Sequence, residues 1–303
     1  MQLPLIKGGP FVKELVLKVL GFILGRRNLW RLGRALYLEA RADTSNKMES
    51  NGEQRIQREM LLACSTNNVT PVIFDVGANV GDWTIALLRN YMSLSLKNRM
   101  EVHCFEPVPT TFDLLRSRII PYISSFDIRL TPKALSEEDG SAEMFVQGEF
   151  AGTNSLHRDV MQDSPSIPIS TTTVHSYCLD NNVETIHFLK CDTEGHDVAV
   201  LYGAKQLFWE ERIMTFQFEY NHRWVYSRHY LLDVFGFVKS LPYSMGKITP
   251  DGIEIYEKWH PELERFFEGN YIIIHNEALS WYSALRGTFD SSNTFVAIGK
   301  ERR

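Results

Sequence analysis

The sequence predicts an α/β fold with a doubly wound, mostly parallel sheet. The first observation is that apolar strand candidates alternate with helical patterns, which is typical of this fold class. The strand candidates lie at residues 71–76, 101–105, 127–131, 186–191 and 213–219, and the helical patterns at 82–92, 109–118, 197–208 and 229–239. The second observation is that three of these strand candidates have acidic residues at their carboxyl ends, followed by a turn. Open α/β sheets bind ligands at that edge.

Two regions follow a less regular pattern. An insert at residues 136–180 contains a strand-like segment at 142–146 and a Ser/Thr/Pro-rich stretch at 163–173, which we expect to be a loop. After residue 240, short strand candidates lie at 243–248, 271–275 and 294–298, with a helical pattern at 261–268 between the last two.

Length and composition limit the class of protein. With 303 residues and 44% hydrophobic content, the chain can bury a large core, and we expect a helical extension at 1–60 and a catalytic domain at 61–303. A net charge of −5 argues against a dedicated nucleic-acid binder. The four cysteines form no CxxC pair, and no signal-peptide pattern is present. These features predict a cytoplasmic protein with reduced thiols.

The N-terminus differs from the rest in composition. Residues 11–25 are nearly all apolar but fall short of the roughly 20 residues that span a bilayer. Residues 1–34 carry seven Lys or Arg against one Glu, a net charge of +6. We favour a cap helix packed on the catalytic domain, because apolar helical faces are usually core. Peripheral membrane contact through residues 1–34 is the alternative, since basic amphipathic helices lie in membrane interfaces.

The first strand candidate ends in a glycine-containing turn. Its sequence, DVGANVGDWT, begins at Asp75, and a helical pattern follows it. Glycines at such a turn let the backbone approach a ligand, and the helix start offers unpaired N–H groups to an anion. The acidic residue suits a ligand that also carries positive charge. Zwitterionic S-adenosylmethionine fits these features better than a pyrophosphate does.

The second strand candidate ends in Glu106, which is followed by Pro107. A carboxylate at the neighbouring strand end can accept both hydrogen bonds of a ribose diol. A nicotinamide-dependent oxidoreductase would satisfy the same features. However, the spacing of Gly77 and Gly81 does not match GxGxxG, which argues against that class.

The fourth strand candidate ends in Asp192 and Glu194, which places both carboxylates at the carboxyl edge of the sheet. With this third segment, the sequence resembles the FkbM family of S-adenosylmethionine-dependent methyltransferases. The resemblance covers roughly residues 50–275 and depends on DVGANVGDWT, CFEPVP, KALSEEDG, GTNSL and LKCDTEGHDVAVLYGA, in that order.

The resemblance implies a class I methyltransferase fold, with a seven-stranded sheet that has one antiparallel edge strand. It also implies O-methylation, with a hydroxyl of a sugar, glycan precursor or secondary metabolite as acceptor. Glu106 would bind the ribose, Ala134 would lie near the adenine, and Asp192 would face the sulfonium and the acceptor. The methionine end would be held by Asp75, Gly77, Asn79 and Gly81.

Methyl transfer to a hydroxyl needs an aligned acceptor and a group that takes its proton. The candidate bases are Asp192, Glu194 and His196. A Mg²⁺ site formed by Asp192, Glu219 and Asn221 is an alternative, but we assign no metal ligand. A cofactor-binding protein that has lost catalysis is a further alternative. The sequence predicts neither the identity of the acceptor nor the oligomeric state.

Overall fold

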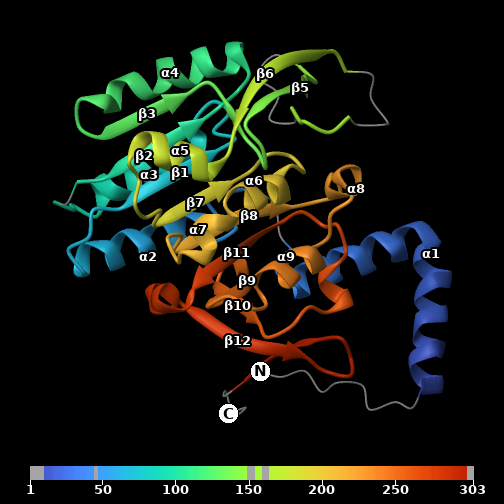
Figure 1. The fold of residues 1–303 in the computed structure, drawn as a ribbon. Coiled ribbons are helices and arrows are strands. Elements are labelled where there is room, and N and C mark those ends of the chain that lie inside the picture. The colour runs from blue at the N-terminus through green and yellow to red at the C-terminus, as the bar shows by residue number, and fades with distance from the viewer. Residues whose placement is uncertain (1–9, 44–46, 98, 149–153, 159–163, 299–303) are drawn as a thin grey trace. The chain divides into compact units, whose positions relative to one another are not determined.

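The computed structural model describes residues 10–43, 47–97, 99–148, 154–158 and 164–298 (Figure 1). The chain forms two compact units, residues 1–44 and residues 45–303. The first unit contains helix α1 (Pro10–Ala40), which is interrupted at Gly25, where φ is 71° and ψ is 152°. No helix within the described residues combines the length and the hydropathy that crossing a bilayer requires.

The boundary between the units differs from the expected one at 60/61. That position falls inside helix α2 (Glu53–Thr66), whose Ile56, Met60 and Cys64 are buried in the core of the second unit. Because α2 packs on the sheet, the division lies between residues 44 and 45.

The parallel part of the main sheet agrees with the sequence prediction. Its strands run in the order β8-β7-β1-β2-β3, and each pairs in parallel with its neighbours. The bounds are β1 (Val72–Val76), β2 (Glu101–Phe105), β3 (Asp127–Thr131), β7 (Phe188–Cys191) and β8 (Thr215–Tyr220). All five predicted strands are therefore present, with their carboxyl ends at one edge of the sheet.

The other half of the sheet differs from the expected single antiparallel edge strand. In the part of the chain that the structure describes, the main sheet has ten strands, and it continues from β8 in the order β11-β9-β10-β12-β13. Strand β11 is antiparallel to both β8 and β9, so an antiparallel strand lies inside the sheet. Strands β10 and β12 also run opposite to the parallel strands. Its Ile272–Ile274 segment is buried on both faces, which suits an interior strand. The bounds are β9 (Tyr243–Thr249), β10 (Gly252–Tyr256), β11 (Gly269–His275), β12 (Ala284–Phe289) and β13 (Phe295–Ala297).

Helices cover both faces of the main sheet (Figure 1). One face packs against α2, α3 (Asp82–Ser93), α4 (Pro109–Ile123) and the 3₁₀ helix η2 (Asn276–Trp281). The opposite face packs against α5 (Val174–Asn181), α6 (Asp197–Gly203), α7 (Lys205–Trp209), α8 (Trp224–Ser227) and α9 (Leu231–Val238). The helix predicted at 197–208 is divided at Ala204, and the one predicted at 261–268 is reduced to the 3₁₀ turn η1 (Pro261–Leu263).

The insert forms a second, three-stranded sheet of β4 (Ala134–Leu135), β6 (Ser166–Thr172) and β5 (Gly140–Phe145). Strand β5 confirms the strand expected near 142–146. The loop expected at 163–173 was wrong, because most of it is β6, which pairs with β5. Ile167 and Ile169 alternate with the exposed residues Ser166, Pro168 and Ser170 and pack on Met144, a period-two pattern that fits a strand.

Candidate active site

The turn after β1 adopts a conformation that favours glycine. Gly77, Asn79 and Gly81 all have positive φ, at 73°, 46° and 86°. A Cβ added to Gly77 would lie 2.0 Å from the backbone oxygen of Asp192, and one added to Gly81 would lie 2.8 Å from Leu115. The close approach that requires these glycines is thus to the end of β7 and to helix α4.

Asp75 lies beneath this turn. Its side chain is fully buried, accepts a hydrogen bond of 2.6 Å from the Thr84 hydroxyl and lies 3.5 Å from Nζ of Lys190. It alternates with Phe74 and Val76, so it faces helix α3 on the same side of the sheet as Ile73. Asp75 and Gly81 line neither of the cavities described below, so the structure does not support the contacts with a cofactor that we expected of them.

The first cavity lies at the carboxyl ends of β1, β2 and β7 and is open to solvent. Five of the seven predicted cofactor residues line it: Gly77, Asn79, Glu106, Ala134 and Asp192. One part of its wall is apolar, with Val108, Leu135, Met144 and Leu156. The cavity therefore combines a polar side with an apolar side from the insert.

Glu106 is the buried carboxylate of this cavity. Its two oxygens accept backbone hydrogen bonds, one from Asn79 at 3.0 Å and one from Val108 at 2.9 Å. Burial raises the pKa of Glu106 to about 7, against the lowering effect of those two bonds. Each oxygen keeps further acceptor capacity for a ligand.

A second cavity, also open to solvent, lies on the other side of the turn. It shares Gly77, Asn79 and Asp192 with the first cavity. Its remaining wall includes Met48, Glu53, Trp83, Lys190, Glu219 and Asn270. Asp192 thus lies where the two cavities meet.

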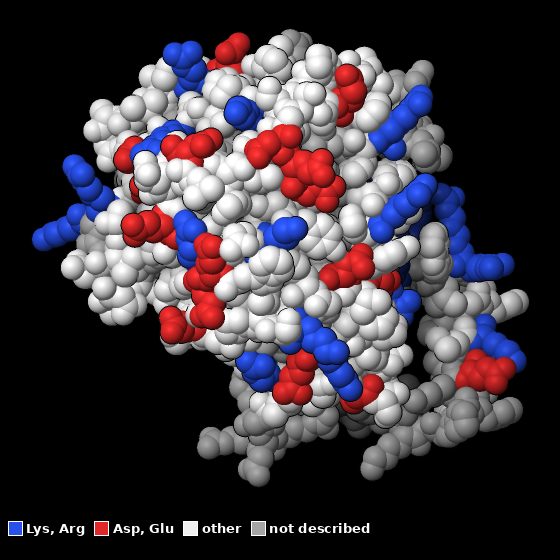
Figure 2. All heavy atoms as spheres, viewed as in Figure 1, with Lys and Arg blue, Asp and Glu red and all other residues white. Residues whose placement is uncertain are grey.

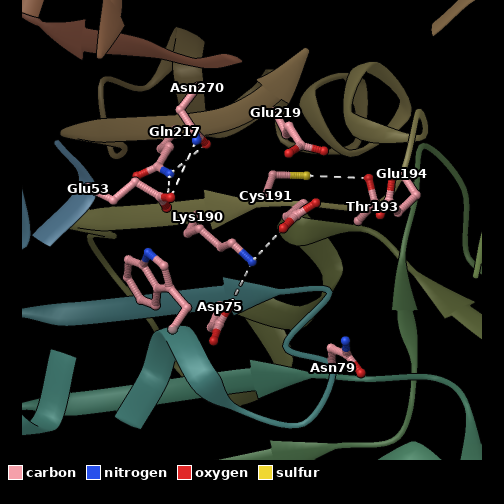
Figure 3. Close-up of polar contacts among 12 residues, drawn as sticks. Glu53, Asp75, Asn79, Lys190, Cys191, Thr193, Glu194, Gln217, Glu219 and Asn270 are labelled. Atoms are coloured by element: carbon pink, nitrogen blue, oxygen red, sulfur yellow. Dashed lines mark hydrogen bonds and ion pairs between the residues drawn. The ribbon is translucent and has the colours of Figure 1, made fainter. Parts of the chain in front are cut away.

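A hydrogen-bonded network of α2, β8 and β11 forms part of the second cavity (Figure 3). Glu53 accepts hydrogen bonds from Asn51 at 2.6 Å and from Gln217 at 2.7 Å. Gln217 also donates to Asn270 at 3.0 Å. Burial raises the pKa of Glu53, although both of its partners lower it.

Lys190 supplies the positive charge of this region. Its buried Nζ lies 3.5 Å from Asp75 and 3.2 Å from Asp192 (Figure 3). Burial lowers the pKa of Lys190, but the carboxylates of Asp192, Asp75 and Glu53 outweigh it, so the pKa is raised overall. The ammonium therefore stays charged and balances the carboxylates around it.

Three carboxylates gather at the junction of the cavities. One oxygen from each of Asp192, Glu194 and Glu219 lies within 4.8 Å of the others, and we call them the carboxylate cluster. Burial raises the pKa of Glu194 to about 7 and that of Glu219 well above its ordinary value, and in both cases Asp192 adds to the effect. Arg223 pairs with Glu194.

The alternative magnesium site included Asn221. Its amide donates to Glu219 at 2.8 Å and accepts from the backbone N–H of Arg223 at 2.8 Å. The geometry therefore brings Glu194 close to Asp192 and Glu219, and it uses Asn221 to hold the turn after β8. Three carboxylate oxygens are ligands that suit Mg²⁺, but Lys190 and Arg223 already supply positive charge beside the cluster.

His196 is held at both ring nitrogens. Nε2 lies 2.9 Å from the Ser136 hydroxyl, and Nδ1 lies 3.2 Å from Nε2 of His157. Burial, together with the smaller effect of two neighbouring histidines, lowers the pKa of His196 to about 3. His196 lines the first cavity and is absent from the wall of the second. Among the three candidate bases, only Asp192 faces both cavities.

The family model for the methyltransferase FkbM domain matches residues 75–245, which is more than half of the chain. The chain belongs to the FkbM methyltransferase family. The resemblance stated from the motifs is confirmed, and the fold is that of a class I methyltransferase.

Solved structures that are similar to this FkbM protein include other methyltransferases at low sequence identity. The METTL16 MTase domain is 10% identical over 72% of this chain and 65% of that one, with a TM-score of 0.39. WbdD is 10% identical over 73% of this chain and 40% of that one, with a TM-score of 0.40. Magnesium protoporphyrin IX methyltransferase from Synechocystis PCC 6803, with bound SAM, is 8% identical over 77% and 85%, with a TM-score of 0.38. The chain thus spans less than two thirds of the first two structures. No curated protein matches the sequence.

Sequence reasoning missed part of the second cavity of this FkbM protein. Glu53, Trp83 and Asn270 were assigned no role, because nothing in their local sequence distinguishes them from a helix-start residue, a core aromatic and a polar strand residue. Lys190 offered a signal, since a lysine within an otherwise apolar, four-residue buried strand needs charged partners.

Proposed function

We propose that the protein is an O-methyltransferase that transfers a methyl group from S-adenosylmethionine to a hydroxyl of a sugar, a glycan precursor or a secondary metabolite. The observation that carries the proposal is the pair of cavities that meet at Asp192. One has a buried carboxylate and an apolar wall, and the other is lined by charged and amide side chains. A donor and an acceptor of different chemistry would then meet at one residue.

The residues of the first cavity fit S-adenosylmethionine. Glu106 can accept from two ribose hydroxyls while it keeps its two backbone hydrogen bonds. Ala134 and Leu135 belong to an apolar wall that suits an adenine ring. Within the described residues, Oδ1 of Asn79 is a buried acceptor without a hydrogen-bond partner, and an ammonium group of the ligand would satisfy it. When bound, the cofactor supplies an electrophilic methyl group on its sulfonium.

Asp192 is the base that the geometry favours. It lies at the junction of the cavities, and its side chain keeps 37% of its surface exposed. In the transfer, the S–CH₃ bond breaks and an O–CH₃ bond forms, and the Asp192 carboxylate takes the hydroxyl proton. Lys190 holds this carboxylate in place, because its Nζ lies 3.2 Å away. Glu194 and His196 line the first cavity but not the second, and His196 also uses both ring nitrogens, so neither is as well placed.

The second cavity supports a polyhydroxylated acceptor. Its wall offers the Glu53 and Glu219 carboxylates, the Asn270 amide and the Lys190 ammonium within one space. The indole N–H of Trp83 is buried and has no hydrogen-bond partner among the described residues. An acceptor with several hydroxyls can donate to the carboxylates and accept from the indole, whereas an apolar acceptor would leave these groups unsatisfied.

Calorimetric titration tests the cofactor half of the proposal. We expect S-adenosylhomocysteine to bind and NAD⁺ not to bind. Binding of NAD⁺ alone would instead support the oxidoreductase alternative and contradict the proposal.

A methyl-transfer screen tests the catalytic half. The protein is incubated with tritiated S-adenosylmethionine and cell extracts separated into glycan, lipid and small-molecule fractions. We expect label in a hydroxyl-bearing glycan or small-molecule product. Asp192→Asn should keep S-adenosylhomocysteine binding but lose transfer by about 10²–10⁴-fold, the usual contribution of a general base. Asp113→Asn, an exposed change on α4, is the matched control and should keep transfer. Cofactor binding without transfer in any fraction would favour the inactive-module alternative.

A further inference from the structure

Helix α1 lies outside the family match and exposes a large apolar surface. Phe22 is 92% exposed, and Ile23 and Trp30 are each 70% exposed. Further large apolar side chains of α1 are also exposed, namely Val12, Leu15, Val16, Leu17, Val19, Leu20, Leu32 and Leu36. A contiguous apolar surface of this kind marks an interaction site.

From these side chains and the charge of the helix, we propose that α1 binds in the plane of a lipid bilayer that contains anionic lipids. The first argument is the width of its apolar face. At 100° per residue, the apolar side chains of residues 15–24 cover roughly 220° of the helix circumference. The remaining arc holds Glu14, Lys18 and Gly21. A helix docked on a protein surface needs an apolar stripe of only about 100°. A wider face suits insertion among lipid chains, which can surround the helix on several sides.

The second argument is charge. Helix α1 carries six Lys or Arg and two Glu, a net charge of +4, so with a chain total of −5 the other residues carry −9. Arg26, Arg27 and Arg31 follow the break at Gly25 and are all exposed. Figure 2 shows several basic side chains and one acidic group along the surface of α1, and a more even mixture of acidic and basic side chains on the visible face of the second unit. Anionic headgroups attract such a basic segment at roughly 1 kcal/mol per Lys or Arg, or about fivefold each.

The third argument explains why the helix would lie in the membrane surface. Residues 10–24 would extend about 22 Å as a helix, against a hydrocarbon core of about 30 Å. The break at Gly25 then separates this apolar half from the arginine-rich half. An in-plane helix lets the first half enter the acyl region while the arginines stay among the headgroups.

Flotation of the full-length protein with vesicles tests the proposal. The vesicles are phosphatidylcholine alone or phosphatidylcholine with phosphatidylserine at about 7:3. We expect the wild type to float with the anionic vesicles and only weakly with the neutral ones. Arg26→Gln/Arg27→Gln/Arg31→Gln should weaken binding by on the order of 100-fold, from about fivefold for each charge. Arg116→Gln, an exposed change on α4, is the matched control and should bind as the wild type does.

A second pair of variants tests the apolar face. Phe22→Ser/Trp30→Ser should lower vesicle binding at least tenfold, from the loss of two buried aromatic side chains. Trp209→Ser, which changes a tryptophan of α7 that is 59% exposed, should have no effect. All variants should keep the thermal transition of the wild type. Absence of binding to anionic vesicles would overturn the proposal. A second outcome would also overturn it. If the wild type self-associated but bound no vesicles, and the Phe22/Trp30 variant no longer self-associated, a second copy of the chain would cover α1 instead of a membrane.

Discussion

Replacement of Lys190 by Met tests whether the ammonium balances the carboxylates at the end of β7. The change keeps an unbranched side chain of similar length and removes the charge between Asp75 and Asp192. The fully buried Asp75 carboxylate then loses the cation 3.5 Å away. Removal of one partner of a buried ion pair typically costs about 3–5 kcal/mol. For a unit of this size, 1 kcal/mol shifts Tm by roughly 2–4 °C, so we expect Tm to fall by about 6–20 °C.

The pH dependence of this loss gives a sharper test. The pKa of Lys190 is raised above its ordinary value of 10.5, so its contribution to stability is fully present below that value and is lost only as pH rises through the raised pKa. The wild type therefore keeps this contribution across the neutral range. In the variant, Glu53 loses the ammonium that lowers its pKa, and its protonation relieves part of the unbalanced charge. The Tm difference should accordingly shrink as pH falls from about 8 to about 5.

Differential scanning calorimetry measures both effects. Lys205→Met, an exposed change on α7, is the control, and its Tm should change by less than about 2 °C. If Lys190→Met lowered Tm no more than this control, or by the same amount at both pH values, the charge-balancing role would be refuted.

Five further predictions concern the ligand sites. Glu106→Ala should weaken S-adenosylhomocysteine binding about 100-fold or more, from the loss of two charge-assisted hydrogen bonds, and an unchanged Kd in calorimetry would contradict the ribose role. In the wild type, the affinity for S-adenosylhomocysteine should increase as pH rises toward about 7, because the ionised carboxylate is the better acceptor and burial raises the pKa of Glu106 to about 7. In Glu106→Ala, the affinity should change little with pH. His196→Asn should lower kcat less than about 10-fold, since a true base would cost more, and a larger loss would restore His196 as the base. EDTA treatment should leave transfer activity intact, because Lys190 and Arg223 already supply positive charge beside the carboxylate cluster. A loss of activity that Mg²⁺ restores would show a metal site. Asn270→Ala should raise the acceptor KM and leave the Kd of S-adenosylhomocysteine unchanged, and the reverse pattern would place Asn270 in the donor site.

The parallel half of the sheet and most of the first cavity could be predicted from the sequence, for a physical reason. A strand buried on both faces is a continuous apolar run, and polar residues directly after such runs must gather at the carboxyl edge of a parallel sheet. Glu106 and Asp192 were found in this way. For Asp75 the same rule predicted a contact with the cofactor. Asp75 lies within β1, however, where side chains point to alternate faces of the sheet, and its side chain lies beneath helix α3.

The remaining features depend on tertiary contacts that leave no local pattern. Strand β11 lies inside the sheet because it pairs with β8 and β9 together, and neither pairing is encoded in its own seven residues. Strand β6 was taken for a loop because Ser, Thr and Pro outweighed the alternation of its isoleucines. The boundary between the two units was expected at 60/61 but lies at 44/45. Helix α2 belongs to the second unit because its apolar side packs into a core that consists mainly of later residues.

The first cavity lies within the segment that matches the family, whereas the second extends beyond it. This difference explains why the residues of the first cavity could be predicted from the sequence and several residues of the second could not. Every residue that lines the first cavity lies within residues 76–196, inside the matched segment 75–245. The second cavity also takes Met48, Glu53 and Asn270 from outside it. The part of the site proposed to bind the donor is therefore built by the family domain alone. The part proposed to bind the acceptor is completed by α2, the segment before it, and the interior strand β11. A change of acceptor between relatives would then require changes at these flanking segments, while Asp192 stays common to both cavities.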